Sequence, residues 1–246
     1  MGDYSYTHWF GGNLAGILSE KILEAHPSFK AEAYIQAVND QCEGMTYTQR
    51  LELHASELRD RLPESYEDAL QILVSILGPE NPKETGMFKH FYWVLPIGKF
   101  VERYGLEDSD LSLAAIGEIT CRNTGEYAIR PYISRYPEKV LAQMKAWSLS
   151  ENFHLRRLAS EGLRPKLPWA KKLELYIDDP EPVFQILENL KEDPRKFVQK
   201  SVANHLTDYL KVNPVPTRVL LYRWRESDHP STQWIVRRAT RKFPLD

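Results

Sequence analysis

Apolar residues recur along the chain at intervals of three and four, the spacing of helices that are buried on one face. In the first third of the chain this pattern predicts helices over 13–24, 29–38, 48–62, 69–77 and 97–104. Pro27 and Pro63 are expected to end two of them, and Ser65 with an acid three residues later predicts the start of another. The glycine- and proline-rich stretch 78–86 predicts a loop. No stretch alternates long enough to predict a strand, so we expect an all-α chain.

From about residue 108 the predicted helices come in pairs. The pairs are 111–121 with 126–136, 137–148 with 153–163, 181–190 with 194–210, and 216–225 with 231–242. The last three second helices share a crude motif that begins at Leu155, Val198 and Val236, which gives intervals of 43 and 38 residues. These intervals are close to the ~40–47 residues of HEAT or armadillo repeats. Because one pair cannot bury its own apolar face, we expect a HEAT-like α-α solenoid with one concave surface.

We expect one HEAT-like-repeat domain over 1–246, with an N-terminal helical part at 1–107 and helix-pair repeats at 108–246. The charge is divided unevenly along it. Residues 1–121 contain 9 Lys and Arg against 19 Asp and Glu, a net of −10, whereas residues 122–246 contain 23 against 15, a net of +8. This asymmetry indicates that the C-terminal half meets an anionic partner.

Several classes of protein are not supported by the sequence. No run approaches the ~18 apolar residues of a membrane span, and the N-terminus lacks the features of a signal peptide. Cys42 and Cys121 are too few for a disulfide framework, and neither has a Cys or His at zinc spacing. The chain also lacks a P-loop, a dinucleotide-binding glycine motif and a nucleophile elbow. We therefore expect a cytoplasmic monomer with no membrane contact, no metal and no cofactor.

The segment 152–169 is expected to be a helix followed by a proline-rich turn. Beside its apolar face the helix carries a polar face with His154, Arg157 and Glu161 at helical spacing. Trp169 follows on a segment that two prolines stiffen. These features predict the wall of a cleft. The pattern is equally compatible with a more common arrangement, namely an amphipathic helix, a turn and a packed Trp.

Two further acids and a set of basic residues are candidates. Asp208 shares a helix face with Ser201 and Asn204, although an acid on such a face is usually only solvated. Glu126 falls at the predicted start of a helix, where the helix end itself favours an acid by about a few tenths of a kcal/mol. The basic residues recur at matching places on successive second helices, which fits a track for backbone phosphates. They are Arg156, Arg157, Arg164, Lys166, Lys200, Arg237, Arg238 and Arg241.

The stretch 155–169, LRRLASEGLRPKLPW, resembles the signature of DNA alkylation repair proteins of the AlkC type. These are HEAT-like-repeat DNA glycosylases, distantly related to the AlkD type. The resemblance extends to 112–131, 201–208 and 234–241, and it covers essentially the whole chain. It implies a monofunctional glycosylase that removes positively charged alkylated bases, such as 3-methyladenine and related N-methyl lesions, from double-stranded DNA in the bacterial cytoplasm.

The resemblance also implies roles for five residues. In that family the positions matching Glu126, Arg157, Glu161, Trp169 and Asp208 line the lesion site. Glu126 and Asp208 are then the catalytic carboxylates, which stabilise the positive sugar and orient or deprotonate water. Trp169 offers a π-face to the cationic base or sugar, a contact of roughly 0.5–2 kcal/mol. Arg157 pairs with Glu161 or contacts a phosphate, and the two shape the pocket.

The sequence departs from the family pattern beside one of these acids. Gly125 stands where the family more often has Ser, and Tyr127 stands where Phe is usual. Neither change removes a charge. The alternative function is a HEAT-repeat scaffold that binds a protein or a DNA structure without catalysis, because a fold does not fix a function.

Overall fold

The computed structural model describes residues 6–85 and 91–245, and every regular element in these ranges is a helix. The predicted all-α fold is confirmed. The chain divides into two compact units, Met1–Ala128 and Ile129–Asp246, which are taken separately below. None of the helices in the described ranges has the length and apolar character needed to cross a bilayer. The expectation of a single domain is not tested by this division and stays a prediction.

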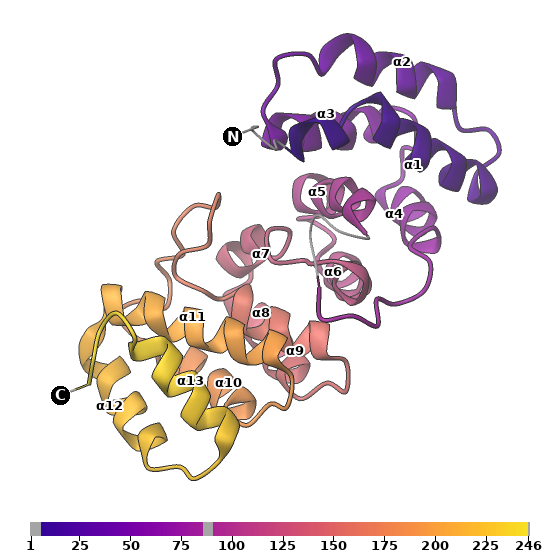
Figure 1. The fold of residues 1–246 in the computed structure, drawn as a ribbon. Helices are drawn as coiled ribbons and strands as arrows, with labels where there is room; N and C mark the ends of the chain where they lie inside the picture. Colours follow the sequence, from indigo (N-terminus) through magenta and orange to yellow (C-terminus); the bar gives the residue numbers. More distant parts are fainter. Residues whose placement is uncertain (1–5, 86–90, 246) are drawn as a thin grey trace. The chain divides into compact units, whose positions relative to one another are not determined.

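Unit 1 is a group of mutually packed helices. Its elements are η1 (Tyr6–Trp9), α1 (Gly12–Ala25), α2 (Ala31–Gln41), α3 (Tyr47–Arg59), α4 (Tyr66–Ser75), η2 (Tyr92–Val94), α5 (Leu95–Tyr104) and α6 (Ser109–Arg122). In this unit α1 packs on α2 and α4, α3 packs on α2 and α5, and α6 packs on α4 and α5 (Figure 1). The side chain of Ser65 accepts a hydrogen bond from Asp68 N at the start of α4, as its sequence predicts.

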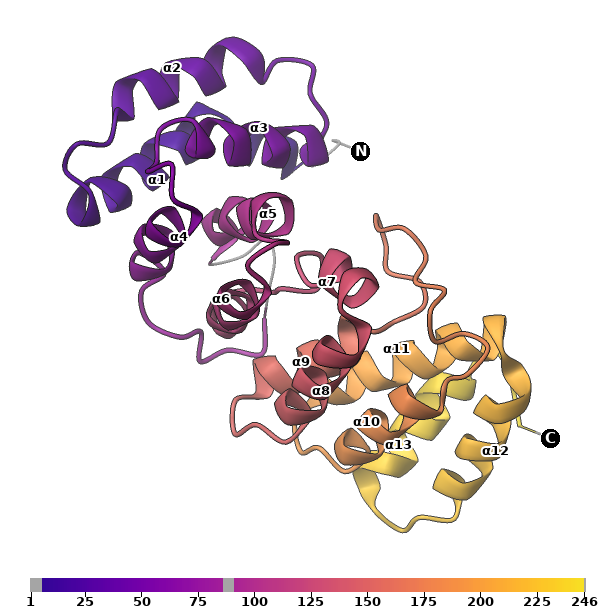
Figure 2. The same ribbon diagram turned by 180° about the vertical axis from the view of Figure 1, so that it is seen from behind.

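Unit 2 is built from helix pairs. Its elements are α7 (Arg130–Arg135), α8 (Pro137–Ser148), α9 (Phe153–Glu161), α10 (Glu181–Leu190), α11 (Lys196–Val212), α12 (Pro214–Arg225) and α13 (Pro230–Thr240). The second helices form one layer, because α9 packs on α11 and α11 packs on α13 (Figure 1). The first helices α8, α10 and α12 lie against this layer, as the view from behind shows (Figure 2). Successive pairs therefore stack as repeats are expected to.

An apolar stripe along α11 forms the core between these layers. Val198, Val202, Leu206 and Leu210 are all buried, and together they fix which face of the helix points inward. The polar positions on the adjacent face of α11, which include Ser201 and Asp208, are consequently turned toward α9 and the loop that follows it. The spacing of apolar residues thus places the candidate site chemistry at the junction of two second helices.

One predicted element is wrong at its start. A helix was expected from Glu126, but residues 126–129 form a turn and α7 begins at Arg130. Pro131 lies in the first turn of α7, where its missing N–H has no helical partner to lose, so the helix begins there. The positive end of a helix therefore does not stabilise the Glu126 carboxylate, and other neighbours hold this side chain.

Candidate active site

Arg164 joins two buried acids of unit 2. Its Nη1 donates to Oε1 of Glu161 at 2.6 Å, while its Nε and Nη2 both donate to Oδ2 of Asp208 at 2.9 and 2.8 Å. Glu161 is the last residue of α9, and Asp208 lies in the C-terminal half of α11. All three side chains are nearly inaccessible to solvent. The packing of α9 on α11 and the helix end before Arg164 together assemble this cluster.

Both carboxylate oxygens of Glu161 are occupied. Besides Arg164, Arg157 approaches Oε1 with its Nη2 at 3.7 Å, and the hydroxyl of Ser201 lies 2.5 Å from Oε2. Burial raises the pKa of Glu161, but the charges of Arg157 and Arg164 and the Ser201 hydrogen bond lower it by more. Glu161 is therefore held as a carboxylate in a buried position.

Asp208 differs from Glu161 in leaving one oxygen open. Oδ2 is held by Arg164, whereas Oδ1 faces Nζ of Lys211 at 3.7 Å and accepts no hydrogen bond from any residue described. The residue is 5% exposed. A carboxylate with one fixed and one open oxygen can bind and orient a water molecule. It can also face a developing positive charge in a site of low dielectric.

Behind the cluster lies a small polar network that connects α9 and α11. Oγ of Ser160 is 3.0 Å from Oγ of Ser201 and 3.4 Å from Nδ1 of His205. The His205 ring stacks on Tyr209 and is fully buried. Burial, and after it the charge of Arg164, lower the pKa of His205 to about 3, so this imidazole is neutral.

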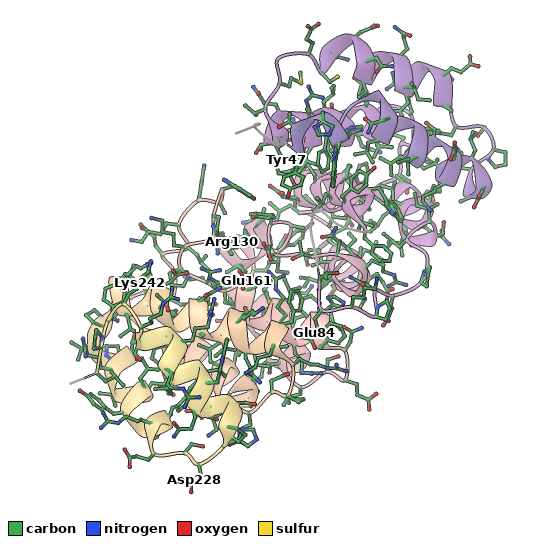
Figure 3. The ribbon with its side chains drawn as sticks, viewed as in Figure 1. Tyr47, Glu84, Arg130, Glu161, Asp228 and Lys242 are labelled. Atoms are coloured by element: carbon green, nitrogen blue, oxygen red, sulfur yellow. The ribbon has the colours of Figure 1, made fainter. Side chains whose placement is uncertain are left out.

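A loop braced by Arg130 follows α9. The Arg130 guanidinium donates to the carbonyl oxygens of Gly162, Arg164 and Lys171 at 3.2, 2.8 and 2.6 Å. It therefore ties together the beginning and the end of the segment 162–173, which projects from the helices of unit 2 (Figure 1). Figure 3 labels Arg130 beside Glu161 in this unit. The carbonyl of Arg164 is thus fixed by the same guanidinium that anchors the loop.

Trp169 is presented at the surface of this loop. Its side chain is 73% exposed, and its φ of 61° is the only positive value among the non-glycine residues described. A residue with a Cβ pays about 1–2 kcal/mol for this conformation relative to the right-handed one. The packed Trp that the pattern also allowed is therefore absent. Strain at an exposed aromatic residue is typical of a ligand-binding position.

Gly162 allows α9 to lie close to its neighbours. A Cβ at this position would come within 2.8 Å of Cε of Met144 and 3.0 Å of Cγ2 of Ile129. Gly162 also follows the last residue of α9, so close packing and the helix end coincide at one residue. Its size therefore sets how near Arg164 lies to the helix layer.

Glu126 occupies a buried turn in unit 1. Thr124 Oγ1 donates to Oε2 of Glu126 at 2.9 Å and accepts from Glu126 N at 3.3 Å. Burial raises the pKa of Tyr47, the first residue of α3, and the negative charge of Glu126 raises it further. Thr124 thus holds this acid, and the phenol of Tyr47 lies within range of its charge. The distance of Glu126 from Asp208 is not tested, and their convergence stays a prediction.

Gly125 is required by the packing beside Glu126. A Cβ at this position would lie 2.6 Å from Oγ1 of Thr120 and 2.7 Å from Cγ2 of Ile116, both on α6. Oγ1 of Thr120 is itself fixed, because it donates to the Ile116 carbonyl at 2.6 Å. The departure from the more usual Ser is therefore matched to the side chains that face it in this chain.

The eight predicted basic residues fall into three groups. Lys166, Lys200, Arg237, Arg238 and Arg241 are exposed, as a phosphate track requires. Arg157 is half-buried and lies over the ring of Phe197 at 4.8 Å. Arg164 and Arg156, by contrast, have internal partners.

Arg156 needs a correction, because its guanidinium makes the bonds of a structural residue. Its Nε is 2.5 Å from Oδ2 of Asp193, and its Nη1 donates to the carbonyls of Ser150 and Glu151 at 2.9 Å each. These contacts connect the start of α9 with the turn before α11. The donors that a phosphate would need are already used, and we remove Arg156 from the proposed track.

Sequence reasoning missed four participants in these arrangements. Thr124 bonds to Glu126, Tyr47 feels the charge of Glu126, Arg130 braces the loop, and Ser201 holds Glu161. Only Ser201 had a usable signal, since it shares a helix face with Asp208. Within the described ranges, no three His, Cys, Asp or Glu side chains gather as the ligands of a metal ion would.

Comparisons with known proteins give a matching family, a similar curated protein and a similar solved structure. The family model described as "DNA alkylation repair enzyme" matches residues 120–243. The uncharacterised protein YhaZ of Bacillus subtilis is 35% identical over 234 residues, which are 94% of this chain and 62% of YhaZ. The solved structure of the Pseudomonas fluorescens alkylpurine DNA glycosylase AlkC, bound to DNA containing an abasic site analog, matches with a TM-score of 0.88 and 31% identity.

The AlkC match covers 98% of this chain and 65% of that chain, so the present chain spans less than two thirds of both relatives. The likeness confirms the helical-repeat fold and the resemblance that segment 155–169 carries. Since the family model covers the buried acids, the arginine between them and the braced loop, the chain belongs to the DNA alkylation repair enzyme family.

Proposed function

We propose that this protein is a monofunctional DNA glycosylase that hydrolyses the N-glycosidic bond of cationic alkylated bases, such as 3-methyladenine, in double-stranded DNA. The observation that carries the proposal is the geometry of Asp208, whose Oδ2 is fixed by Arg164 while Oδ1 is open. The family and the DNA-bound AlkC neighbour support the choice of substrate.

The proposed reaction needs little general-acid catalysis from the protein. Because an N-alkylated base carries a positive charge, it leaves with the electrons of the glycosidic bond as a neutral molecule. The sugar gains positive charge, and a carboxylate near C1′ stabilises it. A water oxygen then bonds to C1′, and a carboxylate accepts the proton of that water. We assign these two tasks to Asp208 and Glu126 without dividing them.

Trp169 is proposed as the aromatic contact. Its indole is exposed on a loop whose two ends are tied by Arg130, so it can meet DNA without a rearrangement of the helices. A π-face against a cationic base or sugar contributes roughly 0.5–2 kcal/mol. Glu161 has no open oxygen, and we therefore propose that it orients Arg164 instead of contacting the lesion.

The exposed basic residues are proposed to hold the DNA backbone. These are Lys166, Lys200, Arg237, Arg238 and Arg241, with Arg157 at the edge of the acid cluster. Each phosphate contact releases counterions, so affinity should fall steeply as salt rises. We further propose that the protein acts as a monomer. Because both relatives are bacterial proteins, we place it in the bacterial cytoplasm.

The test is release of free methylated bases from methylated duplex DNA. Asp208→Asn and Glu126→Gln are compared with Asp228→Asn and Glu84→Gln, which change exposed acids of the same two units (Figure 3). We expect release by wild type and both controls, an intact strand at the abasic site, and a loss of about 100-fold or more in the two site variants.

The other outcomes are equally informative. Release that is unchanged in both site variants would keep the glycosylase and discard these carboxylates. No release from wild type, together with tight and salt-sensitive DNA binding, would establish the non-catalytic DNA-binding alternative.

A further inference from the structure

We propose that Ser201 is a positioning residue of the candidate active site, which fixes Glu161 and thereby the direction in which Asp208 presents its open oxygen. The inference rests on the proposed glycosylase function and goes beyond it, because Ser201 itself contacts neither DNA nor water in this assignment. Its position is deep in unit 2, where it is 2% exposed between α9 and α11.

The hydroxyl of Ser201 has one proton and two neighbouring acceptors. Oε2 of Glu161 lies at 2.5 Å and Oγ of Ser160 at 3.0 Å. A carboxylate accepts more strongly than a hydroxyl, and the shorter distance agrees with a charge-assisted bond. Ser201 therefore donates to Glu161. This bond crosses from α11 to α9, so the helix that carries Asp208 also orients the acid at the end of α9.

Fixing Oε2 fixes the other end of the same carboxylate. With Oε2 held by Ser201, Oε1 points at Nη1 of Arg164, 2.6 Å away. The guanidinium is planar and rigid, so the orientation of one N–H edge determines the orientation of the other. That other edge carries the Nε and Nη2 that grip Oδ2 of Asp208. The remaining oxygen of Asp208, Oδ1, is consequently aimed by a chain that begins at Ser201.

The charged neighbours of Glu161 determine how the pKa of Glu161 responds when the Ser201 hydroxyl is removed. Arg157 on α9, Arg164 in the loop, and Asp208 and the neutral His205 on α11 are the titratable groups around it. The two arginines keep Glu161 ionised, but burial opposes ionisation. Removing the Ser201 donor removes one of the contributions that lower the pKa of Glu161. The carboxylate is then protonated at a higher pH than in wild type.

The experiment measures base release by Ser201→Ala, Ser201→Thr and Ser148→Ala between pH 4 and 8, together with DNA affinity and thermal stability. Ser148 is the matched control, because it is also a buried serine of unit 2 whose hydroxyl is bonded, to the Lys145 carbonyl and to Asn189. Ser201→Thr keeps the hydroxyl.

We expect Ser201→Ala to lower kcat by about 10- to 100-fold while KM changes by less than about twofold, because a bond to a charged group is lost within the site. The acid limb of its pH profile should move to higher pH. Ser201→Thr should recover most of the rate and restore the acid limb, and Ser148→Ala should lower the melting temperature without moving either quantity.

Three outcomes would overturn the inference. A Ser201→Ala protein with the rate and pH profile of wild type has no need of the hydroxyl. A fall in rate that follows the melting temperature, and that Ser148→Ala shares, assigns Ser201 a structural role only. An inactive wild type contradicts the proposed function itself, and with it the inference, whereas in the first two outcomes the wild type still releases bases.

Discussion

Arg164 and Asp208, 44 residues apart in the chain, meet through two N–H groups that converge on the single oxygen Oδ2. An arginine that paired with both oxygens would occupy the whole carboxylate and leave no oxygen able to contact water or the sugar. The convergent arrangement fixes the side chain and leaves Oδ1 toward Lys211 at 3.7 Å. Asp208 is thereby buried and held in place, while its Oδ1 can still accept a hydrogen bond.

Replacing Arg164 by Ala should be strongly destabilising. The change leaves the carboxylates of Glu161 and Asp208 buried without their shared cation, and the loss of one partner from a buried ion pair costs about 3–5 kcal/mol. Urea unfolding measures the difference. Arg103→Ala, which breaks an exposed pair with Glu52, is the control and should cost about 0–1 kcal/mol. If the two changes lowered the free energy of unfolding equally, Arg164 would not be the partner of two buried carboxylates.

The stability contributed by Glu161 should depend on pH. Its folded-state pKa lies below the ordinary value of 4.5, so this contribution is present above pH 4.5 and is lost as pH falls through the folded pKa. The free energy of unfolding of wild type should therefore exceed that of Glu161→Gln most at neutral pH, and the gap should narrow in acid. A gap that stays constant from pH 7 to pH 3 would contradict the assignment of an ionised Glu161.

Substitutions of Trp169 should separate function from stability. Because the side chain is 73% exposed, Trp169→Ala should change the free energy of unfolding by about 0.5 kcal/mol or less while base release is largely lost. Trp169→Gly should be more stable than Trp169→Ala by about 1 kcal/mol, since glycine adopts a φ of 61° without strain. Thermal melts of the two variants check the backbone, and base release checks the indole. A Gly variant less stable than the Ala variant would exclude the strained conformation.

Gly125→Ser should destabilise this chain, although the family resemblance implies Ser at this position. The new Cβ would meet Thr120 and Ile116 at distances that real side chains do not tolerate, so α6 or the turn with Glu126 has to move. We expect a loss of about 1–3 kcal/mol in stability and slower base release. Gly16→Ser is the matched control, because its Cβ would have nothing within 4 Å. Wild-type behaviour of Gly125→Ser would show that the turn is not tightly packed.

The helices could be predicted because their signals are local. Prolines and apolar spacing predicted α8 and α10 with their ends. The start of α7 was missed, since a turn of four residues has the same apolar spacing as the first turn of a helix. Local patterns therefore predict that a helix is present more reliably than they predict the residues at which it begins and ends.

The site could be predicted only in its residue types. Spacing placed Arg157 near Glu161, four residues away on one helix, but it could not bring Arg164 to Asp208 or Ser201 to Glu161, because these pairs join different elements. The exposure of Trp169 depends on the backbone of a loop, and its sequence equally allowed a packed side chain. For the same reason Arg156, which shares its motif with Arg157, could not be distinguished as structural.

Arg130 holds the loop after α9 through main-chain oxygens of Gly162, Arg164 and Lys171. An anchor of this kind is indifferent to which side chains the loop carries. A change of an exposed side chain between Arg164 and Lys171 therefore leaves these three bonds in place. The bonds that hold the loop are thus independent of the indole that it exposes at Trp169, so the surface of the loop and the helices beneath it can change separately.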